Sequence, residues 1–194
     1  MPPLDLRLYK NDLRKYYKEK RSKLDKQKKD DMDRQITQNV LKLRLYKNAK
    51  KLLIYVSTDI EVNTRDIISH AFKDGKVVAV PRCIPDTRQM NFHIIKSFDD
   101  LEPSNYSLYE PKETLPILED FNSSIMIVPA LSIDQRGYRL GYGKGYYDRY
   151  LVKYTGIKIG LCYSDDIRRQ LLYGRYDKPV DLIVTEKGIR RPKG

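Results

Sequence analysis

The segment 137–151, GYRLGYGKGYYDRYL, combines residue types that suit the binding of an anion. It places four glycines within nine residues, with Arg139 and Lys144 among them, directly before a helical pattern at 146–154. A glycine-rich loop lets backbone N–H groups approach a phosphate closely, and the N-terminus of the following helix adds a favourable dipole. The spacing therefore predicts a phosphate or nucleotide site, and a glycine-rich turn without a ligand is the alternative.

Two common phosphate-binding motifs do not fit this segment. A Walker A loop needs Ser or Thr after its Gly-Lys pair, and here Gly145 follows Lys144. A dinucleotide-binding fingerprint needs G-x-G-x-x-G directly after the first strand. Gly141, Gly143 and Gly145 are instead spaced G-x-G-x-G, late in the chain. The predicted site is therefore of neither type.

Helical patterns dominate the first part of the chain. Neither Pro nor Gly occurs in residues 4–74, and apolar residues recur at helical spacing in 6–25 and 29–46. We therefore expect two helices in a basic N-terminal part, residues 1–50, followed by an α/β sheet core, residues 51–194. Because no repeat or low-complexity linker separates the two parts, all 194 residues are expected to form one domain.

Short apolar runs rich in β-branched residues predict the strands of the core. They lie at 52–56, 76–81, 124–130, 157–163 and 181–186. Because these runs do not alternate in polarity, we expect both faces to be covered, as in a parallel sheet. A helical pattern at 62–75 joins the first two strands as in a β-α-β unit. The alternating segment 90–95 indicates a more exposed strand, and the proline-containing segment 97–123 is expected to be irregular.

Composition limits the class of protein. Hydrophobic residues make up 40% and charged residues 33%, which is ordinary for a soluble globular domain. No apolar run is long enough to span a membrane, and no secretory signal is visible. Cys83 and Cys162 lie in apolar, strand-like segments, so we expect free, buried thiols in a reducing cytoplasm. His70 and His93 match no metal-ligand spacing and are expected to be structural.

The net charge of +12 is concentrated near the N-terminus. Residues 1–51 hold 17 Lys and Arg against 7 Asp and Glu, whereas the rest of the chain is nearly balanced. A basic segment of this kind favours an anionic partner, such as nucleic acid, a nucleotide or a polycarboxylate. The alternative is the solvated face of Lys-rich helices.

The pattern G-x-R-L-G-x-G-x-G-Y-Y-D-R at 137–149 closely resembles the signature of the 5-formyltetrahydrofolate cyclo-ligase (5,10-methenyltetrahydrofolate synthetase) family. Four further markers of that family occur in the family's order along almost the whole chain. They are K-x-x-L-R at 10–14, Glu61 between the first strand and the next helix, Pro81-Arg82 at the end of a strand, and Val180-Asp181 before a strand.

The resemblance implies a fold and a reaction. The fold is a single three-layer α/β/α sandwich with a mainly parallel sheet, here with a helical N-terminal extension. The reaction is the ATP- and Mg²⁺-dependent cyclisation of 5-formyltetrahydrofolate to 5,10-methenyltetrahydrofolate, a ligase step of folate and one-carbon metabolism. Phosphorylation of the formyl oxygen and ring closure by N10 would release ADP and phosphate.

The resemblance also implies roles for particular residues. Arg139 and Lys144 are the expected catalytic cations. ATP binding is expected at Lys10, Arg14, Arg82, Arg139, Leu140, Gly141, Tyr142, Gly143, Lys144, Gly145, Tyr146 and Tyr147. Binding of the folate is expected at Val56, Glu61, Tyr142, Gly143, Lys144, Gly145 and Tyr146.

Three acidic residues have a structural alternative beside the functional role that the resemblance implies. Glu61 would accept two hydrogen bonds from the pterin, or it is only a helix N-terminal acid. Asp148 and Asp181 would help to hold Mg²⁺. Alternatively, Asp148 only complements the helix dipole, and Asp181 is an ordinary turn acid.

Two other classes of protein compete with this interpretation. A nucleic-acid-binding protein would account for the basic segment but would leave the glycine-rich signature unexplained. A different enzyme on a similar sheet, such as a sugar-phosphate isomerase, would not need ATP. We expect ATP and 5-formyltetrahydrofolate, with or without a polyglutamate tail, as partners of a monomer, and neither nucleic acid nor a membrane.

Overall fold

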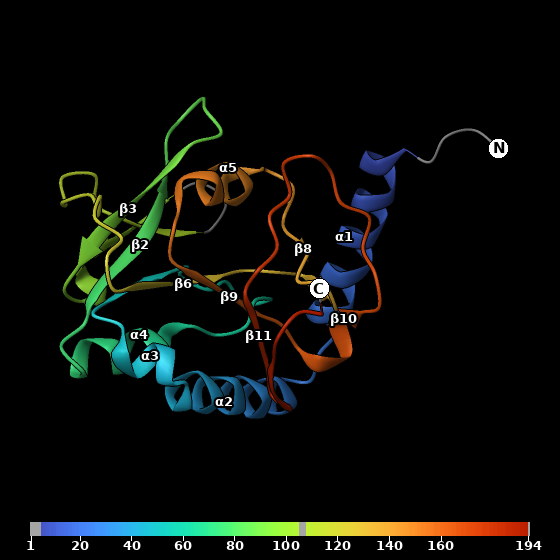
Figure 1. Ribbon diagram of the computed structural model, residues 1–194, viewed down its shortest axis with the longest axis horizontal. Coiled ribbons are helices and arrows are strands. Elements are labelled where there is room, and N and C mark those ends of the chain that lie inside the picture. The colour runs from blue at the N-terminus through green and yellow to red at the C-terminus, as the bar shows by residue number, and fades with distance from the viewer. Residues whose placement is uncertain (1–4, 105–107, 194) are drawn as a thin grey trace.

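A seven-stranded sheet forms the centre of the protein, whose computed structural model describes residues 5–104 and 108–193 (Figure 1). The strand order is β12-β11-β9-β6-β1-β2-β3. The inner strands are parallel, and the edge strands β12 and β3 pair antiparallel. The bounds are β1 Lys51–Ile54, β2 Val77–Cys83, β3 Met90–Ile95, β6 Ser124–Val128, β9 Ile157–Leu161, β11 Leu182–Thr185 and β12 Gly188–Arg190. The predicted mainly parallel sheet is confirmed.

Helices cover both faces of the sheet, as the unbroken apolar strands require. On one face lie α2 (Lys26–Lys42), α3 (Arg44–Asn48) and α4 (Arg65–Lys73), and on the other lies α5 (Tyr146–Lys153) (Figure 1). Each face has its own buried cluster. The predicted three-layer α/β/α architecture is confirmed.

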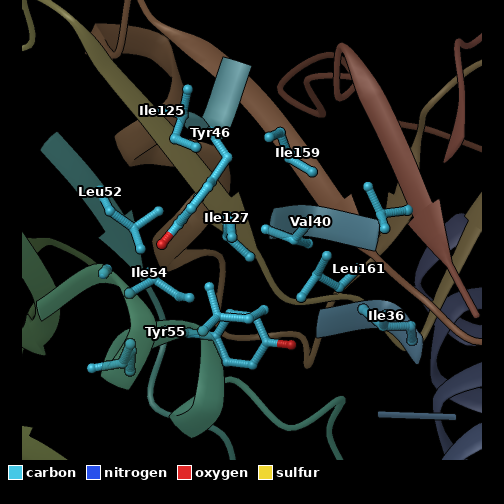
Figure 2. Packing of buried hydrophobic residues seen from close by; sticks show 14 of the residues in the cluster. Ile36, Val40, Tyr46, Leu52, Ile54, Tyr55, Ile125, Ile127, Ile159 and Leu161 are labelled. Carbon is cyan, nitrogen blue, oxygen red and sulfur yellow. The ribbon is translucent and has the colours of Figure 1, made fainter. Parts of the chain in front are cut away.

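The larger cluster forms where α2 meets the strands. Figure 2 shows Ile36 and Val40 of α2 beside Ile159 and Leu161 of β9, and each of the four is fully buried. Along β1, Leu52 and Ile54 belong to this cluster, whereas Leu53 between them belongs to the cluster beneath α5. This alternation follows from the two-residue period of a strand. The same period applies to β2, so its alternate residues also face opposite sides of the sheet.

The first helix, α1 (Leu6–Ser22), packs beside a small second sheet that the sequence did not predict. That sheet consists of β7 (Ser132–Asp134), β8 (Arg139–Leu140) and β10 (Ile167–Arg168). Tyr17 of α1 is buried with Leu131, Leu140 and Leu171 in a third cluster. The basic N-terminal helix is thereby held next to the glycine-rich segment.

Several predicted boundaries differ from the structure for local reasons. The first two helices were expected at 6–25 and 29–46, but Asp25 caps α2 by accepting a hydrogen bond from Lys28 N at 2.9 Å, so α1 ends earlier. The backbone of Leu43 is extended and separates α2 from α3. The segment 97–123 contains a short antiparallel pair, β4 (Leu101–Pro103) and β5 (Tyr109–Pro111); its residues 105–107 lie outside the described residues.

The topology defines the edge of the sheet where a ligand is expected. The chain passes from β1 through β2 to β3 on one side, and from β6 through β9 to β11 on the other. Strand order therefore reverses between β1 and β6. Open α/β sheets bind ligands outside the carboxyl ends of the strands at such a switch point. Within the described part of the chain, no helix is both long and apolar enough to cross a membrane.

Candidate active site

Glu61 lies in the turn after β1, at the switch point. Its Oε2 accepts hydrogen bonds from Thr58 N at 2.8 Å and Thr58 Oγ1 at 3.0 Å, and the residue is only 8% exposed. Burial raises the pKa of the Glu61 carboxyl, although the Thr58 hydrogen bonds and the charge of Arg21 oppose this rise. Because α4 begins at Arg65, Glu61 is outside the helix. Its interpretation as a helix N-terminal acid is therefore wrong.

The glycine-rich loop adopts a backbone that requires glycine. Gly143 has φ of 99° and Gly145, the N-cap of α5, has φ of 77°, both in the left-handed region. A Cβ added at Gly143 would lie 3.1 Å from the Arg14 guanidinium, and one at Gly141 would lie 2.9 Å from Arg139 Nη1. The glycines thus let two arginines approach the loop closely.

The two cations of the K-x-x-L-R motif lie on one face of α1 and reach the glycine-rich side of the molecule. Arg14 Nε donates to the Gly141 carbonyl at 2.9 Å, and Lys10 forms an ion pair with Asp177. Burial lowers the pKa of Arg14, while the negative charges of Asp148 and Asp177 oppose this shift. The structure therefore brings Arg14 to the predicted phosphate loop, whereas Lys10 pairs with the segment that precedes β11.

Arg139 and Asp148 form an ion pair beside this loop. Arg139 Nη2 donates to Asp148 Oδ1 at 2.6 Å, and the guanidinium lies over the Tyr147 ring, 5.5 Å from its centroid. The Arg139 side chain is 4% exposed and that of Asp148 32%. Asp148 also occupies the first turn of α5, so its predicted helix-dipole role is compatible with the structure.

Buried polar atoms without a partner occur in the glycine-rich segment 137–151, and two of them lie near Glu61. Among the described residues these are Arg139 Nε and the hydroxyls of Tyr142 and Tyr147. Burial, followed by the negative charge of Glu61, raises the pKa of both tyrosines. The Tyr142 hydroxyl lies near the Glu61 carboxyl and lowers its pKa. It does not form a hydrogen bond with that carboxyl. Unsatisfied buried polar groups are costly, so this arrangement indicates a site for a polar ligand.

Comparison with known proteins assigns the family. The model of the 5-formyltetrahydrofolate cyclo-ligase family matches residues 8–186. The chain belongs to this family. It is therefore a cyclo-ligase, and ATP use follows from the family.

Individual relatives agree with this assignment over nearly their whole length. A probable 5-formyltetrahydrofolate cyclo-ligase of Schizosaccharomyces pombe is 32% identical, with 94% of this chain and 98% of the relative covered. The Saccharomyces cerevisiae cyclo-ligase is 30% identical over 91% and 94%. The solved structure of Aquifex aeolicus 5,10-methenyltetrahydrofolate synthetase superimposes with a TM-score of 0.84 at 30% identity, covering 95% of this chain and 93% of that one.

Three other predicted site residues of the cyclo-ligase, Leu140, Lys144 and Tyr146, belong to the glycine-rich segment itself. Leu140 is buried in the cluster beneath α1, and Lys144 is exposed in the loop itself. Tyr146 packs on the cluster beneath α5. Burial raises the pKa of the Cys83 thiol to about 12, although a hydrogen bond from Tyr146 opposes this rise. Val56 is partly buried against the larger cluster, between β1 and Glu61.

Arg82 faces away from this group of residues. Because Val78 and Val80 belong to the cluster beneath α2 and α4, the two-residue period places Arg82 on that face, opposite α5. Arg82 Nη1 donates to Glu102 Oε1 at 2.8 Å and to the Pro111 carbonyl at 2.7 Å. The structure therefore attaches Arg82 to the β4–β5 pair and does not bring it to the glycine-rich loop.

Asp181 lies where the parallel strands begin, whereas Glu61 lies where they end. It directly precedes β11, so it sits at the amino end of a parallel strand. Its Oδ2 accepts from Lys158 N at 2.7 Å and pairs with Lys158 Nζ at 2.9 Å. Asp148, in contrast, lies at the carboxyl edge beside Arg139. The structure does not bring the two predicted Mg²⁺ ligands together.

The remaining titratable candidates have structural surroundings. His93 Nδ1 lies 2.8 Å from the Leu115 carbonyl within the protein, as expected for a structural histidine. Both cysteines are free, as predicted, but only Cys162 is fully buried and Cys83 is partly exposed. Across residues 5–104 and 108–193, no group of three or more His, Cys, Asp and Glu could hold a metal ion.

Sequence reasoning missed Arg21. It lies seven residues after Arg14 on α1 and is 3% exposed. The available signal was its helical spacing from Lys10 and Arg14, but many other cations of the basic segment share such spacings.

Proposed function

We propose that this protein uses ATP to convert 5-formyltetrahydrofolate to 5,10-methenyltetrahydrofolate. The observation that carries the proposal is the convergence of Glu61, the glycine-rich loop and Arg14 at the switch point of the sheet. An acidic acceptor for a pterin thereby lies near a cationic loop suited to phosphates. Family membership supports the same substrates.

The reaction joins a phosphoryl transfer to a ring closure. The formyl oxygen attacks the γ-phosphorus of ATP, and the bond to the β-phosphate oxygen breaks to release ADP. The N10 lone pair then attacks the formyl carbon. Loss of the N10 proton and cleavage of the carbon–oxygen bond release phosphate and leave the methenyl ring. The protein must therefore position two substrates and stabilise phosphate charge.

Cations and backbone groups of the glycine-rich loop would bind the phosphates. Lys144 is exposed in that loop, and the Arg14 guanidinium lies against Gly143. The N-terminus of α5 adds its dipole and its backbone N–H groups, since no described side chain caps it. Arg139 would contribute charge once ATP competes with Asp148 for its guanidinium.

Asp148 suits Mg²⁺ as a single protein carboxylate beside bound phosphates. Mg²⁺ commonly takes one or two carboxylates and completes its shell with water and phosphate oxygens, so a larger acidic cluster is not required. When bound, the ion would neutralise charge that develops on the phosphates. We do not assign Asp181 to this role, since its position at the other edge of the sheet gives no support for it.

Glu61 would recognise the pterin through two hydrogen bonds. Its Oε2 already accepts from Thr58, which fixes the carboxylate, and its Oε1 can turn to the ligand. The hydroxyls of Tyr142 and Tyr147 stand nearby and lack partners among the described residues. Tyr146 would pack against the folate rings, as the family signature suggests.

The decisive experiment is an assay of the purified protein. Incubation with 5-formyltetrahydrofolate, ATP and Mg²⁺ should produce the near-ultraviolet absorbance of the methenyl product, and omission of ATP should abolish it. Folded protein that forms no product would contradict the proposal. A rise in melting temperature with ATP and with the folate, but not with RNA or a sugar phosphate, would exclude the two alternative classes.

A further inference from the structure

Arg21 joins the loops that follow three neighbouring strands. Its Nη1 donates to the Ile60 carbonyl, after β1, at 3.3 Å. Its Nη2 donates to the carbonyls of Ala130 and Leu131, after β6, at 2.9 Å each. Its Nε donates to Asp166, after β9, at 3.1 Å. Because β9, β6 and β1 are adjacent in the sheet, one planar guanidinium holds the carboxyl ends of all three strands.

One of these contacts lies next to the residue proposed to bind the pterin. Ile60 directly precedes Glu61, so its hydrogen bond to Arg21 fixes the backbone from which the Glu61 side chain projects. The charge of Arg21 also favours the ionised form of Glu61. The other titratable groups that face Glu61 are Tyr55 after β1, Tyr142 of the glycine-rich loop and Tyr147 of α5.

The helix that carries Arg21 also carries the proposed nucleotide-binding cations. Lys10 and Arg14 lie on the same face of α1 and contact Asp177 and the Gly141 carbonyl. The seven residues from Arg14 to Arg21 are two helical turns. A single helix therefore contacts the glycine-rich loop from its middle, through Arg14, and the Glu61 loop near its C-terminus, through Arg21.

We propose that Arg21 is a positioning residue that aims Glu61 at the folate and ties the folate-binding loop to the ATP-binding helix. The proposal rests on the proposed function. Arg21 acts through other residues, because its side chain is 1% exposed and its donors are directed to acceptors of the protein. It is therefore distinct from Arg14, Arg139 and Lys144, which would contact ATP.

Two substitutions separate geometry from charge. Arg21→Lys keeps the charge, but an ammonium group cannot span the three loops. Arg21→Gln also removes the charge. Both should lower kcat/KM for 5-formyltetrahydrofolate about 10- to 100-fold, because a small misplacement of a positioning group is costly in rate. The KM for ATP should change less, since Lys10 and Arg14 keep their own contacts. Only Arg21→Gln should move the acid limb of the folate pH profile upward, because it removes a positive charge that favours the ionised form of Glu61.

Lys20 provides a matched control on the same helix. It contacts the same Asp166, with Nζ 2.6 Å from Oδ1, but it has no hydrogen bond to Ile60 and its side chain is 33% exposed. Lys20→Met should therefore leave folate kinetics within about twofold of wild type, as expected for loss of a partly exposed ion pair. An equal effect of the two positions would show that Asp166, and not the Ile60 contact, is responsible, and would overturn the proposal.

Stability measurements keep the test decisive. Because Arg21→Gln leaves Asp166 buried without its partner, the double variant R21M/D166L removes both charges and restores an apolar interior. Unchanged folate kinetics in any folded Arg21 variant overturns the proposal. So does a parallel loss for both substrates, or failure of all three variants to fold, since either outcome makes Arg21 purely structural. A wild-type protein that forms no methenyl product refutes the proposed function itself, and this inference with it.

Discussion

Substitution of Glu61 by Gln tests the folate side of the site most directly. Both hydrogen bonds from Thr58 go to Oε2, and both Thr58 groups are donors there. The amide oxygen of the introduced glutamine must therefore take the place of Oε2, because the amide nitrogen would meet the Thr58 N–H. The NH₂ group then replaces Oε1, where it faces the donors of the pterin.

The size of the loss follows from this orientation. One charge-assisted hydrogen bond is lost, and two donors oppose each other in a site where Glu61 is 8% exposed. A mismatch of buried polar groups of this kind costs about 2–4 kcal/mol in transition-state binding. That corresponds to a loss of about 30- to 1000-fold in kcat/KM for 5-formyltetrahydrofolate. ATP binding should be nearly unaffected, because Arg14 and Gly143 keep their positions.

Stability should change in the opposite direction. Because burial raises the folded-state pKa of Glu61 above its unfolded value, the carboxyl favours folding below the unfolded pKa and loses that contribution as pH rises through the folded pKa. At neutral pH the ionised carboxylate is therefore a cost that the glutamine removes. We expect Glu61→Gln to melt at or slightly above the wild-type temperature at pH 7.

The assay combines steady-state kinetics for each substrate with a melting curve. Asp59→Asn is the matched control, because Asp59 is exposed in the same turn two residues away. It should leave folate kinetics unchanged. The reasoning is refuted if Glu61→Gln retains wild-type kcat/KM for the folate, or if its melting temperature falls and both substrates are used equally poorly.

Three further predictions concern the phosphate side. Arg14→Ala should raise the KM for ATP without unfolding the protein, because Arg14 is only partly buried and its hydrogen bond goes to a loop carbonyl; kinetics and a melting curve measure both effects. Asp148→Asn should lose most activity and regain part of it at raised Mg²⁺. Asp181→Asn should keep the Mg²⁺ dependence of the wild type and lose less than about 1 kcal/mol of stability. Equal Mg²⁺ dependence of the two variants would contradict the proposed role of Asp148. Gly143→Ala should weaken ATP use by displacing Arg14, while Gly75→Ala, which has a similar positive φ but open space, should cost only about 1 kcal/mol in a denaturation curve.

The sheet and the glycine-rich loop could be predicted from the sequence because each depends on local chemistry. Strands such as Ser124–Val128 consist of apolar residues almost throughout, a pattern that only coverage on both faces explains. The loop needs glycine at positions 143 and 145 because its backbone is left-handed there. Family resemblance then supplied the reaction, which neither pattern contains.

The position of Asp181 could not be judged from its motif alone. A carboxylate next to a strand can be taken for a metal ligand when it is not known whether it lies at the amino or the carboxyl end of that strand. Asp181 precedes β11, and Glu61 follows β1; in parallel strands these are opposite edges of one sheet. The position of Arg82 was equally hard to predict from its motif. A shift of one residue along β2 moves a side chain from the face covered by α5 to the face covered by α4.

The basic N-terminal part shows why counting charges does not identify a partner. Lys10, Arg14 and Arg21 point inward from one face of α1, and each has a defined acceptor elsewhere in the chain. Lys15 and Lys18, between them in sequence, are exposed, although the Lys18 ammonium lies 5.5 Å from the centroid of the Tyr142 ring. In the sequence all five look alike, as cations of one amphipathic helix. Their acceptors cannot be recognised there, because apart from Ile60 they follow more than a hundred residues later in the chain. The cations of α1 therefore include some with defined acceptors beside the site and others that are exposed, and only tertiary packing shows which are which.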